Sequence, residues 1–157
     1  MRRIIGIIPL ILLIFIALML IPRFDGTLSS LQRHFSTNRT TQPIRKNETV
    51  VLFAARQVGA HNFTNCISVA ISKDGIYFYL EPPFGILLKP VFIPWEEIKA
   101  YSLTYWGDST DTNVWIPRAG VEIAFKQSAK QVLGHCERLK IPKMENVAMQ
   151  QMRVRGT

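Results

Sequence analysis

An uninterrupted run of apolar residues lies close to the amino terminus. Residues 4–21 contain no charged or polar side chain, and Arg2, Arg3 and Arg23 mark the ends of the run. An α-helix of this length rises about 27 Å, close to the thickness of the hydrocarbon core of a bilayer. The pattern therefore predicts a transmembrane anchor over residues 1–23. The apolar side chains expected to contact lipid along it are Ile4, Ile8, Leu12, Phe15, Leu18 and Ile21.

A cleaved secretory signal is the alternative interpretation of this run. Such signals have a shorter apolar region, followed by a small-x-small cleavage site. Residues 17–20 (Ala-Leu-Met-Leu) offer no such site, so an uncleaved anchor is favoured. The arginines before and after the run nearly balance, so charge leaves the side of the membrane undecided.

Between the anchor and the first strand, the chain is predicted to form a short helix and then a basic linker, together residues 24–47. Leu28, Leu31 and Phe35 fall on one helical face, with Thr27 as the helix cap. Two helical turns are unstable alone, so this helix must pack on the domain or on the membrane interface. The rest of the stretch is polar and basic, which is typical of a linker.

Alternation of apolar and polar residues with a period of two then predicts a mainly β domain. Asp74-Gly75 supplies the turn of a hairpin whose alternate apolar residues face one core. Residues 107–113 are polar and predict a loop. The predicted strands are residues 50–56, 67–72, 76–80, 91–93, 98–105, 114–116 and 121–126.

A helix is predicted directly after the last strand. Ser128 and Gln131 have the spacing of a capping box, and apolar residues recur at helical spacing as far as Cys136. An open antiparallel sheet must cover its exposed apolar end, and a terminal helix does so. We therefore expect one domain over residues 48–140, mainly β with a carboxy-terminal α-helix, and a basic, flexible tail over residues 141–157.

Two short motifs on consecutive predicted strands carry a resemblance to a known superfold. They are Asp74-Gly75-Ile76-Tyr77 and Ile93-Pro94-Trp95-Glu96-Glu97-Ile98, and the terminal helix follows them. This arrangement resembles the pleckstrin-homology-like domains, including their bacterial and GRAM-type relatives. The resemblance implies a seven-stranded open barrel over residues 48–140, here preceded by one amino-terminal transmembrane helix. The layout is also similar to that of small bacterial membrane-anchored proteins, which implies a plasma or inner membrane.

The formal charge of +8 on 157 residues favours an anionic partner. Basic residues concentrate on both sides of the predicted β region, and each contributes on the order of 1 kcal/mol at an anionic bilayer surface. The open alternative is that these residues only solubilise the chain and help to set its topology. The candidate contacts with an anionic surface are Arg23, Arg33, Arg39, Lys140 and Lys143.

The sequence contains no persuasive catalytic or metal-binding constellation. Glu96 and Glu97 are adjacent, so on a strand they point to opposite faces and cannot share acid–base work. His135 and Cys136 point about 100° apart on a helix, which disfavours a shared metal. We therefore expect no enzymatic activity, no metal and no cofactor. Cys66 and Cys136 are expected to be buried free thiols.

Oxygen ligands and aromatic residues suggest two further binding chemistries, and the sequence argues against both. Asp108, Asp111 and Asn113 lack the spacing and the closing glutamate of a calcium loop. The three tryptophans, with Tyr101 and Tyr105, are not interleaved with basic residues as a nucleic-acid platform requires. These aromatic side chains are therefore expected in the core, and nucleic acid is not an expected partner.

Together these patterns predict a single-pass, membrane-tethered binding or interaction module of the pleckstrin-homology-like class, without catalysis. Its expected partners are the lipid bilayer, through residues 1–23, and a membrane protein. Arg56, His61 and Lys73 are too few for a specific phosphoinositide site beside the first strand pair. The alternative is an extracytoplasmic structural or ligand-binding β-domain held by the same helix. A hydrolase with a site assembled across loops is a third hypothesis, and no pair of residues can be nominated for it.

Overall fold

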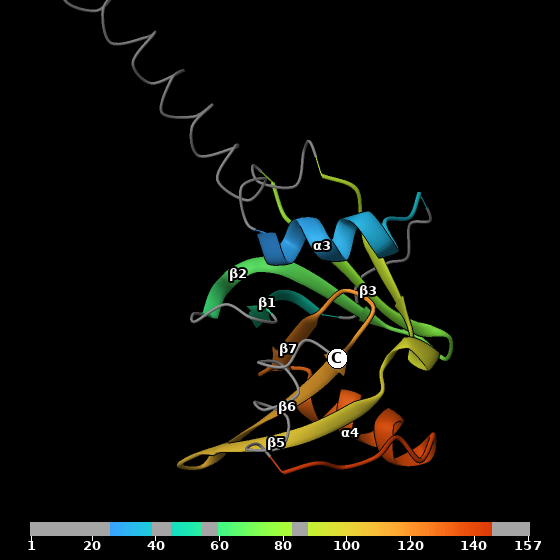
Figure 1. Cartoon of the computed structure of the whole chain (residues 1–157). Coiled ribbons are helices and arrows are strands. Elements are labelled where there is room, and N and C mark those ends of the chain that lie inside the picture. Colours follow the sequence, from blue (N-terminus) through green and yellow to red (C-terminus); the bar gives the residue numbers. More distant parts are fainter. Residues whose placement is uncertain (1–25, 39–44, 55–59, 83–87, 146–157) are drawn as a thin grey trace, which may run out of the picture.

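The chain folds into a strongly curved antiparallel sheet with a helix on each of two sides (Figure 1). The computed structural model describes residues 26–38, 45–54, 60–82 and 88–145. The predicted anchor lies outside these residues. Within them, no helix is long and apolar enough to cross a bilayer.

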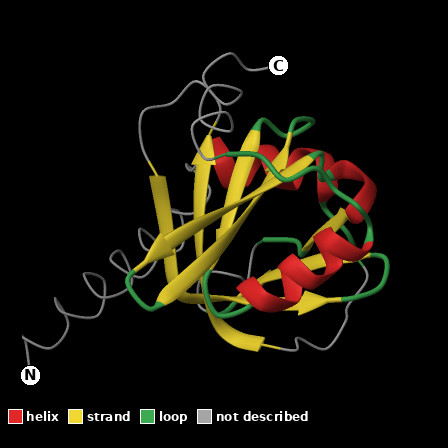
Figure 2. Cartoon of the chain, turned by 90° about the horizontal axis from the view of Figure 1, so that it is seen from below, coloured by secondary structure: helices red, strands yellow, loops and turns green. Residues whose placement is uncertain are grey.

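Seven strands form the sheet, in the order β4-β3-β2-β1-β7-β6-β5. All six neighbouring pairs are antiparallel, and the pairing of β1 with β7 joins a half made of β1 to β4 to a half made of β5 to β7. Figure 2 shows strands of the two halves crossing one another. The strands are β1 (Arg45–Ala54), β2 (Ala60–Ile71), β3 (Gly75–Leu80), β4 (Val91–Pro94), β5 (Ala100–Trp106), β6 (Ser109–Ile116) and β7 (Val121–Phe125).

Helix α3 (Gly26–Phe35) precedes the sheet and α4 (Ala129–Arg138) follows it. A single 3-10 turn, η1 (Trp95–Glu97), separates β4 from β5. The predicted class, mainly β with a helix after the last strand, is confirmed. The short helix before the first strand is confirmed as well.

The register of the β2–β3 hairpin is the one that the alternation predicts. Its inward-facing pairs are Ile67–Leu80, Val69–Phe78 and Ile71–Ile76. Tyr77 points to the opposite face, where its ring packs 4.4 Å from the ring of Phe92 on β4. Tyr77 is nevertheless buried, because the neighbouring aromatic rings cover it. One face of the hairpin therefore serves the core, and the other carries a small aromatic cluster.

The hydrophobic core fills the space inside the curved sheet, and the two helices close it on different sides (Figure 1). Leu28, Leu31 and Phe35 of α3 are fully or nearly fully buried there, as the amphipathic pattern predicts. From α4, Val132 and Cys136 enter the same core. Helix α3 contacts β1, β4 and β7, whereas α4 contacts β6 and β7.

Both edges of the sheet are partly covered by the segments that flank it. Along β4, Ser36 forms a bridge with Val91, and the amide of Thr37 donates to the carbonyl of Pro90 at 2.9 Å. Along β5, Tyr101 accepts a hydrogen bond at 2.8 Å from the amide of Met144. Edge strands left open are templates for pairing with other chains. The protein's own chain satisfies part of each edge.

Several segment boundaries differ from the predictions. The second strand begins at Ala60 and not at residue 67, because the residues before 67 pair with β1. The polar stretch 107–113 is not one loop, because β6 begins at Ser109 and pairs its polar residues with β5. The predicted linker ends early, because β1 begins at Arg45. The described part of the predicted flexible tail, residues 141–145, lies beside β5. In each case, backbone pairing with a neighbouring strand overrides a polar local composition.

The predicted cap of α3 is wrong, whereas Ser128 is the N-cap residue of α4 as predicted but does not form the expected capping box. Thr27 lies inside α3 and is buried, so it does not cap the helix. Ser128 makes no side-chain cap hydrogen bond to α4, and its hydroxyl instead donates to the carboxylate of Glu48. The same carboxylate accepts a hydrogen bond from the amide of Gln127 at 2.7 Å. A glutamate on β1, distant in sequence, therefore occupies the amino end of α4, where a negative charge is favoured.

Glu48 is completely buried and links the first strand to the last helix. Beside it, the amide of Thr49 donates to the side-chain oxygen of Gln127 at 2.8 Å, and the amide nitrogen of Gln127 donates back to the Thr49 hydroxyl at 3.2 Å. A buried charge is tolerated only where hydrogen bonds satisfy it. This cluster fixes the direction in which the chain leaves β7.

Glu48→Ala is expected to lower the free energy of unfolding by about 3 kcal/mol, because it leaves the Gln127 amide and the Ser128 hydroxyl buried without their acceptor. Glu48→Gln keeps one acceptor oxygen and is expected to cost about 1 kcal/mol. Urea denaturation followed by tryptophan fluorescence measures both changes. Glu96→Ala, at an exposed position, is the control. A Glu48→Ala variant as stable as this control would contradict the assigned role.

Gly75→Ala is expected to destabilise the protein by about 2 kcal/mol through overpacking. A Cβ atom at this position would lie 2.6 Å from the Phe92 ring and 2.9 Å from the carbonyl carbon of Ile93. Gly134→Ala is the matched control, because nothing lies within 4 Å of a Cβ there and alanine favours the helix by about 1 kcal/mol. Thermal unfolding should therefore shift in opposite directions for the two variants.

Candidate functional site

A cavity of about 830 Å³ opens between the β2–β3 turn, η1 and the segment that follows α4. Its rim carries three exposed lysines, Lys73, Lys99 and Lys140. We call this site the lysine-rimmed pocket. Its other lining residues are Asp74, Phe92, Pro94, Trp95, Glu96, Ile98, Leu139, Ile141 and Pro142.

The β2–β3 turn and η1 are fixed to one another by hydrogen bonds. The Ser72 hydroxyl accepts from the amides of Asp74 and Gly75, each at 3.2 Å, which sets the turn. The indole nitrogen of Trp95 donates to the Ser72 carbonyl at 2.9 Å, and the Trp95 amide donates to the Asp74 carbonyl at 3.2 Å. Trp95 is buried, so it forms a fixed wall between the turn and the core.

The far wall of the pocket is built by the end of α4. The amide of Ile141 donates to the carbonyl of Cys136 at 2.9 Å, and the amide of Lys140 donates to the carbonyl of Glu137 at 3.1 Å. These two bonds define a Schellman motif, in which the residue after the cap adopts a left-handed conformation and is usually glycine. Here that residue is Lys140, with a φ of 56°. The motif leaves Leu139 exposed at 47% beside it.

Charges of both signs line the pocket, with lysines in the majority. The two acidic residues are Asp74 and Glu96, compared with three lysines. The ammonium group of Lys99 donates to the backbone carbonyl of Glu96 at 2.5 Å, which holds this lysine at the rim. Apolar side chains lie between the charges. The pocket therefore offers cations around an apolar surface, which suits an anionic ligand with an apolar part.

His135 lies behind the pocket, stacked on Trp95. The two ring centroids are 4.8 Å apart and the ring planes differ by 7°. Burial lowers the pKa of His135 below 6.5, and the nearby charge of Arg138 lowers the pKa further. The neutral imidazole is therefore the form that packs against the indole ring at neutral pH.

Both cysteines are free, as predicted, although only Cys136 is fully buried and Cys66 is half-buried. Burial, with a smaller contribution from Glu137, raises the pKa of the Cys136 thiol to about 12. Burial also raises the pKa of Cys66. A thiol that stays protonated is a poor nucleophile and a poor metal ligand. In the described part of the chain, no group of three or more His, Cys, Asp or Glu residues is placed to hold a metal ion.

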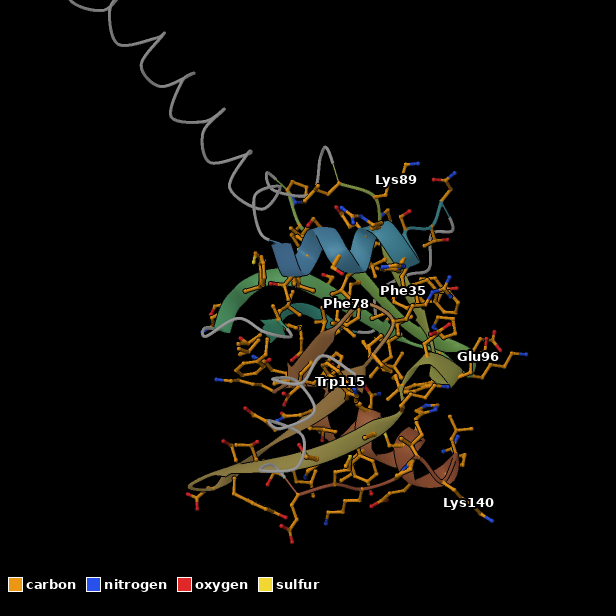
Figure 3. The ribbon with its side chains drawn as sticks, in the orientation of Figure 1. Phe35, Phe78, Lys89, Glu96, Trp115 and Lys140 are labelled. Carbon is orange, nitrogen blue, oxygen red and sulfur yellow. The ribbon has the colours of Figure 1, made fainter. Side chains whose placement is uncertain are left out.

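The predicted anionic-surface residues do not form one cluster. Arg33 is exposed on α3, whereas Lys140 lies at the other side of the domain, below α4 (Figures 1 and 3). Lys143 is exposed beside Tyr101, at the covered edge of β5. Arg23 and Arg39, like the anchor residues, lie outside the described residues. The structure instead groups Lys140 with Lys73 and Lys99.

The residues considered for catalysis or calcium binding do not lie together in one site. Glu96 and Glu97 lie in η1 and not on a strand, and Glu97 forms an ion pair of 3.0 Å with Arg118. Asp108 is exposed in a turn, whereas Asp111 and Asn113 are buried within β6. The prospective calcium ligands are thus divided between a turn and a strand.

The aromatic residues are distributed largely as predicted. Trp95, Tyr101 and Trp115 are buried, so they are not available to stack nucleic-acid bases. Tyr105 is 68% exposed on β5, against the prediction. Chemical type alone does not distinguish these positions, because the facing strand and helix decide which aromatic side chains are covered.

The lysine-rimmed pocket was not found from the sequence. Its three lysines come from the β2–β3 turn, from the residue before β5 and from the segment after α4, so no local motif joins them. One local signal does exist: the sequence Leu139-Lys140-Ile141-Pro142 ends a helix without the glycine expected there.

A comparison of the chain with family models, curated proteins and solved structures finds no match. The fold and the pocket are therefore the basis for any functional conclusion.

The stability of the protein is expected to fall as the pH is lowered from 7.5 to 5.5. The pKa of His135 is depressed in the folded state, so the unfolded chain binds a proton more readily near pH 6.5 and acid favours unfolding. His135→Phe keeps a ring on Trp95 but does not titrate, so its melting temperature should depend less on pH in this window, by a few degrees. Equal pH dependence in both proteins would contradict this assignment.

Proposed function

We propose that the protein is a single-pass, membrane-tethered binding module with a pleckstrin-homology-like domain and no catalytic role. The observation that carries the proposal is the docking of α3. Its apolar side chains lie in the core, and the Ser30 hydroxyl donates to the carbonyl of Ala119 at 2.7 Å. The helix begins at Gly26, so residues 22–25 can separate the domain from the end of the apolar run by at most about 17 Å. The domain is thus held close to any membrane that contains residues 4–21.

The sheet supports the assignment to the pleckstrin-homology-like class. Its strands follow one another as two meanders, and only the β1–β7 pairing joins strands far apart in sequence. The sheet has seven strands and is strongly curved, and α4 follows its last strand and covers one side, which agrees with the seven-stranded open barrel and terminal helix that the resemblance implies (Figure 1). A fold of this kind supports many functions, so the ligand has to come from the site.

The chemistry of the described residues favours binding over catalysis. Glu97 forms an ion pair with Arg118, and Glu48 accepts hydrogen bonds within a buried structural cluster. Cys136 is a buried, protonated thiol. The lysine-rimmed pocket offers cations and apolar surface, which recognise ligands without a general acid, a general base or a nucleophile.

The full chain is expected to remain with membranes after an alkaline carbonate wash. A variant with Leu12→Arg and Phe15→Arg should be released, because each arginine at the centre of a membrane helix costs about 3 kcal/mol. Leu12→Ile with Phe15→Leu is the matched control and should be retained. Immunoblotting of the pellet and supernatant measures the outcome. Release of the unmodified chain would contradict the tether.

Protease accessibility in oriented membrane vesicles then decides on which side the domain lies. In inverted vesicles the cytoplasmic face is outside, so cleavage within residues 88–145 of intact vesicles places the domain in the cytoplasm. Cleavage only after the vesicles are opened places the domain on the opposite side. A cytoplasmic domain fits an interaction module, and a domain on the other side fits the alternative of an extracytoplasmic ligand-binding β-domain.

A further inference from the structure

The lysine-rimmed pocket contains a residue in an unfavourable backbone conformation. Lys140 has a φ of 56°, which lies in the left-handed region. In this region a residue with a Cβ atom is less stable than glycine. Nothing in the Schellman motif itself requires a lysine, because the two backbone hydrogen bonds would form with glycine in this position. Unfavourable conformations of this kind concentrate at functional sites. The side chain of Lys140 is therefore a candidate for a role beyond ending the helix.

The surroundings of Lys140 define the chemistry of a ligand. Lys73 and Lys99 line the same pocket as Lys140, and these three cations outnumber its two carboxylates, Asp74 and Glu96. Leu139 is 47% exposed. Among the described residues, Tyr105 is the other large apolar side chain that is exposed. Cations around an uncovered leucine match carboxylates that flank an apolar side chain.

The position of the pocket favours a peptide over the membrane surface. Lys140 lies on the side of the domain away from α3 (Figure 3), and α3 leads directly to the proposed anchor. In this respect the inference rests on the proposed function. A lipid headgroup in the tethering bilayer is next to the amino end of α3, whereas a segment of another protein reaches the far side freely.

The two sheet edges bear on the mode of recognition. The segments at Ser36–Thr37 and Pro142–Met144 already bond to β4 and β5, so a partner strand would have to displace them. Side chains of the pocket remain available without such displacement. We propose that the lysine-rimmed pocket binds an acidic peptide segment of a partner protein. Its carboxylates lie at Lys73, Lys99 and Lys140, and one apolar side chain packs on Leu139 and Ile141.

The first experiment uses the full chain in lipid nanodiscs and two synthetic probes of opposite charge. The acidic probe is the peptide Glu-Glu-Leu-Glu-Glu, and the basic probe Lys-Lys-Leu-Lys-Lys keeps the same apolar residue. Methyl NMR signals of Leu139 and Ile141 should shift and saturate with the acidic probe and stay in place with the basic one. Absence of a saturable shift with the acidic probe overturns the proposal, as does equal binding of both probes.

The second experiment separates the side chain of Lys140 from its backbone. Lys140→Gly should raise the melting temperature by about 2–5 °C, because it relieves the left-handed conformation. The same change should weaken binding of the acidic probe about threefold or more, because a cation is lost from the rim. Lys140→Arg keeps the cation and should bind like the unmodified chain. Lys89→Gln, an exposed lysine near α3 in Figure 3, should change neither property.

Two outcomes of these variants overturn the proposal. In the first, Lys140→Gly raises stability but leaves binding of the acidic probe unchanged, which makes Lys140 a position without a binding role. In the second, Lys140→Gly weakens binding to phosphatidylglycerol vesicles and not to the peptide, which identifies a lipid surface as the ligand. Retention after the carbonate wash is measured separately, so failure of the tether and failure of the peptide site are distinguishable.

Discussion

The antiparallel pairing of β1 with β7 is the contact on which the rest of the structure depends. It joins residues about seventy positions apart, from Val50 with Phe125 to Ala54 with Val121. Each half of the sheet is a meander of local hairpins, so only this pairing requires closure of a long loop. Once it forms, it aligns the inward residues of both halves. It also brings Glu48 to the start of α4, so the last helix takes its direction from the first strand.

The same topology explains how the protein treats its sheet edges. Because β1 and β7 pair in the middle, β4 and β5 are left as the outer strands. The chain before β1 reaches β4, and the chain after α4 reaches β5. These contacts limit pairing with other chains, which is a hazard for any antiparallel sheet with open edges. They also leave the proposed recognition to side chains at the end of α4 and in the turns beside it.

The lysine-rimmed pocket is the place where local sequence preference and observed structure disagree most clearly. The Schellman motif favours glycine after the cap, and the chain has Lys140 there. Around it, the turn at Ser72 and the indole of Trp95 form a fixed support. Lys140 has an unfavourable backbone conformation and lies beside this fixed support. Such an arrangement is expected where a side chain is retained for binding and not for folding.

Short-range pattern determined much of this protein. Period-two alternation predicted the β2–β3 register and β7, and helical spacing predicted the buried face of α3, because each pattern reflects the geometry of a single element. Local composition misplaced the start of β6, and it predicted a capping box at Ser128 that does not form. Polar residues such as Ser109 are held by strand pairing, and Ser128 is engaged by Glu48, eighty residues away in sequence. The grouping of Lys73, Lys99 and Lys140 was likewise decided by tertiary structure alone, because three separate segments meet only after the sheet has closed.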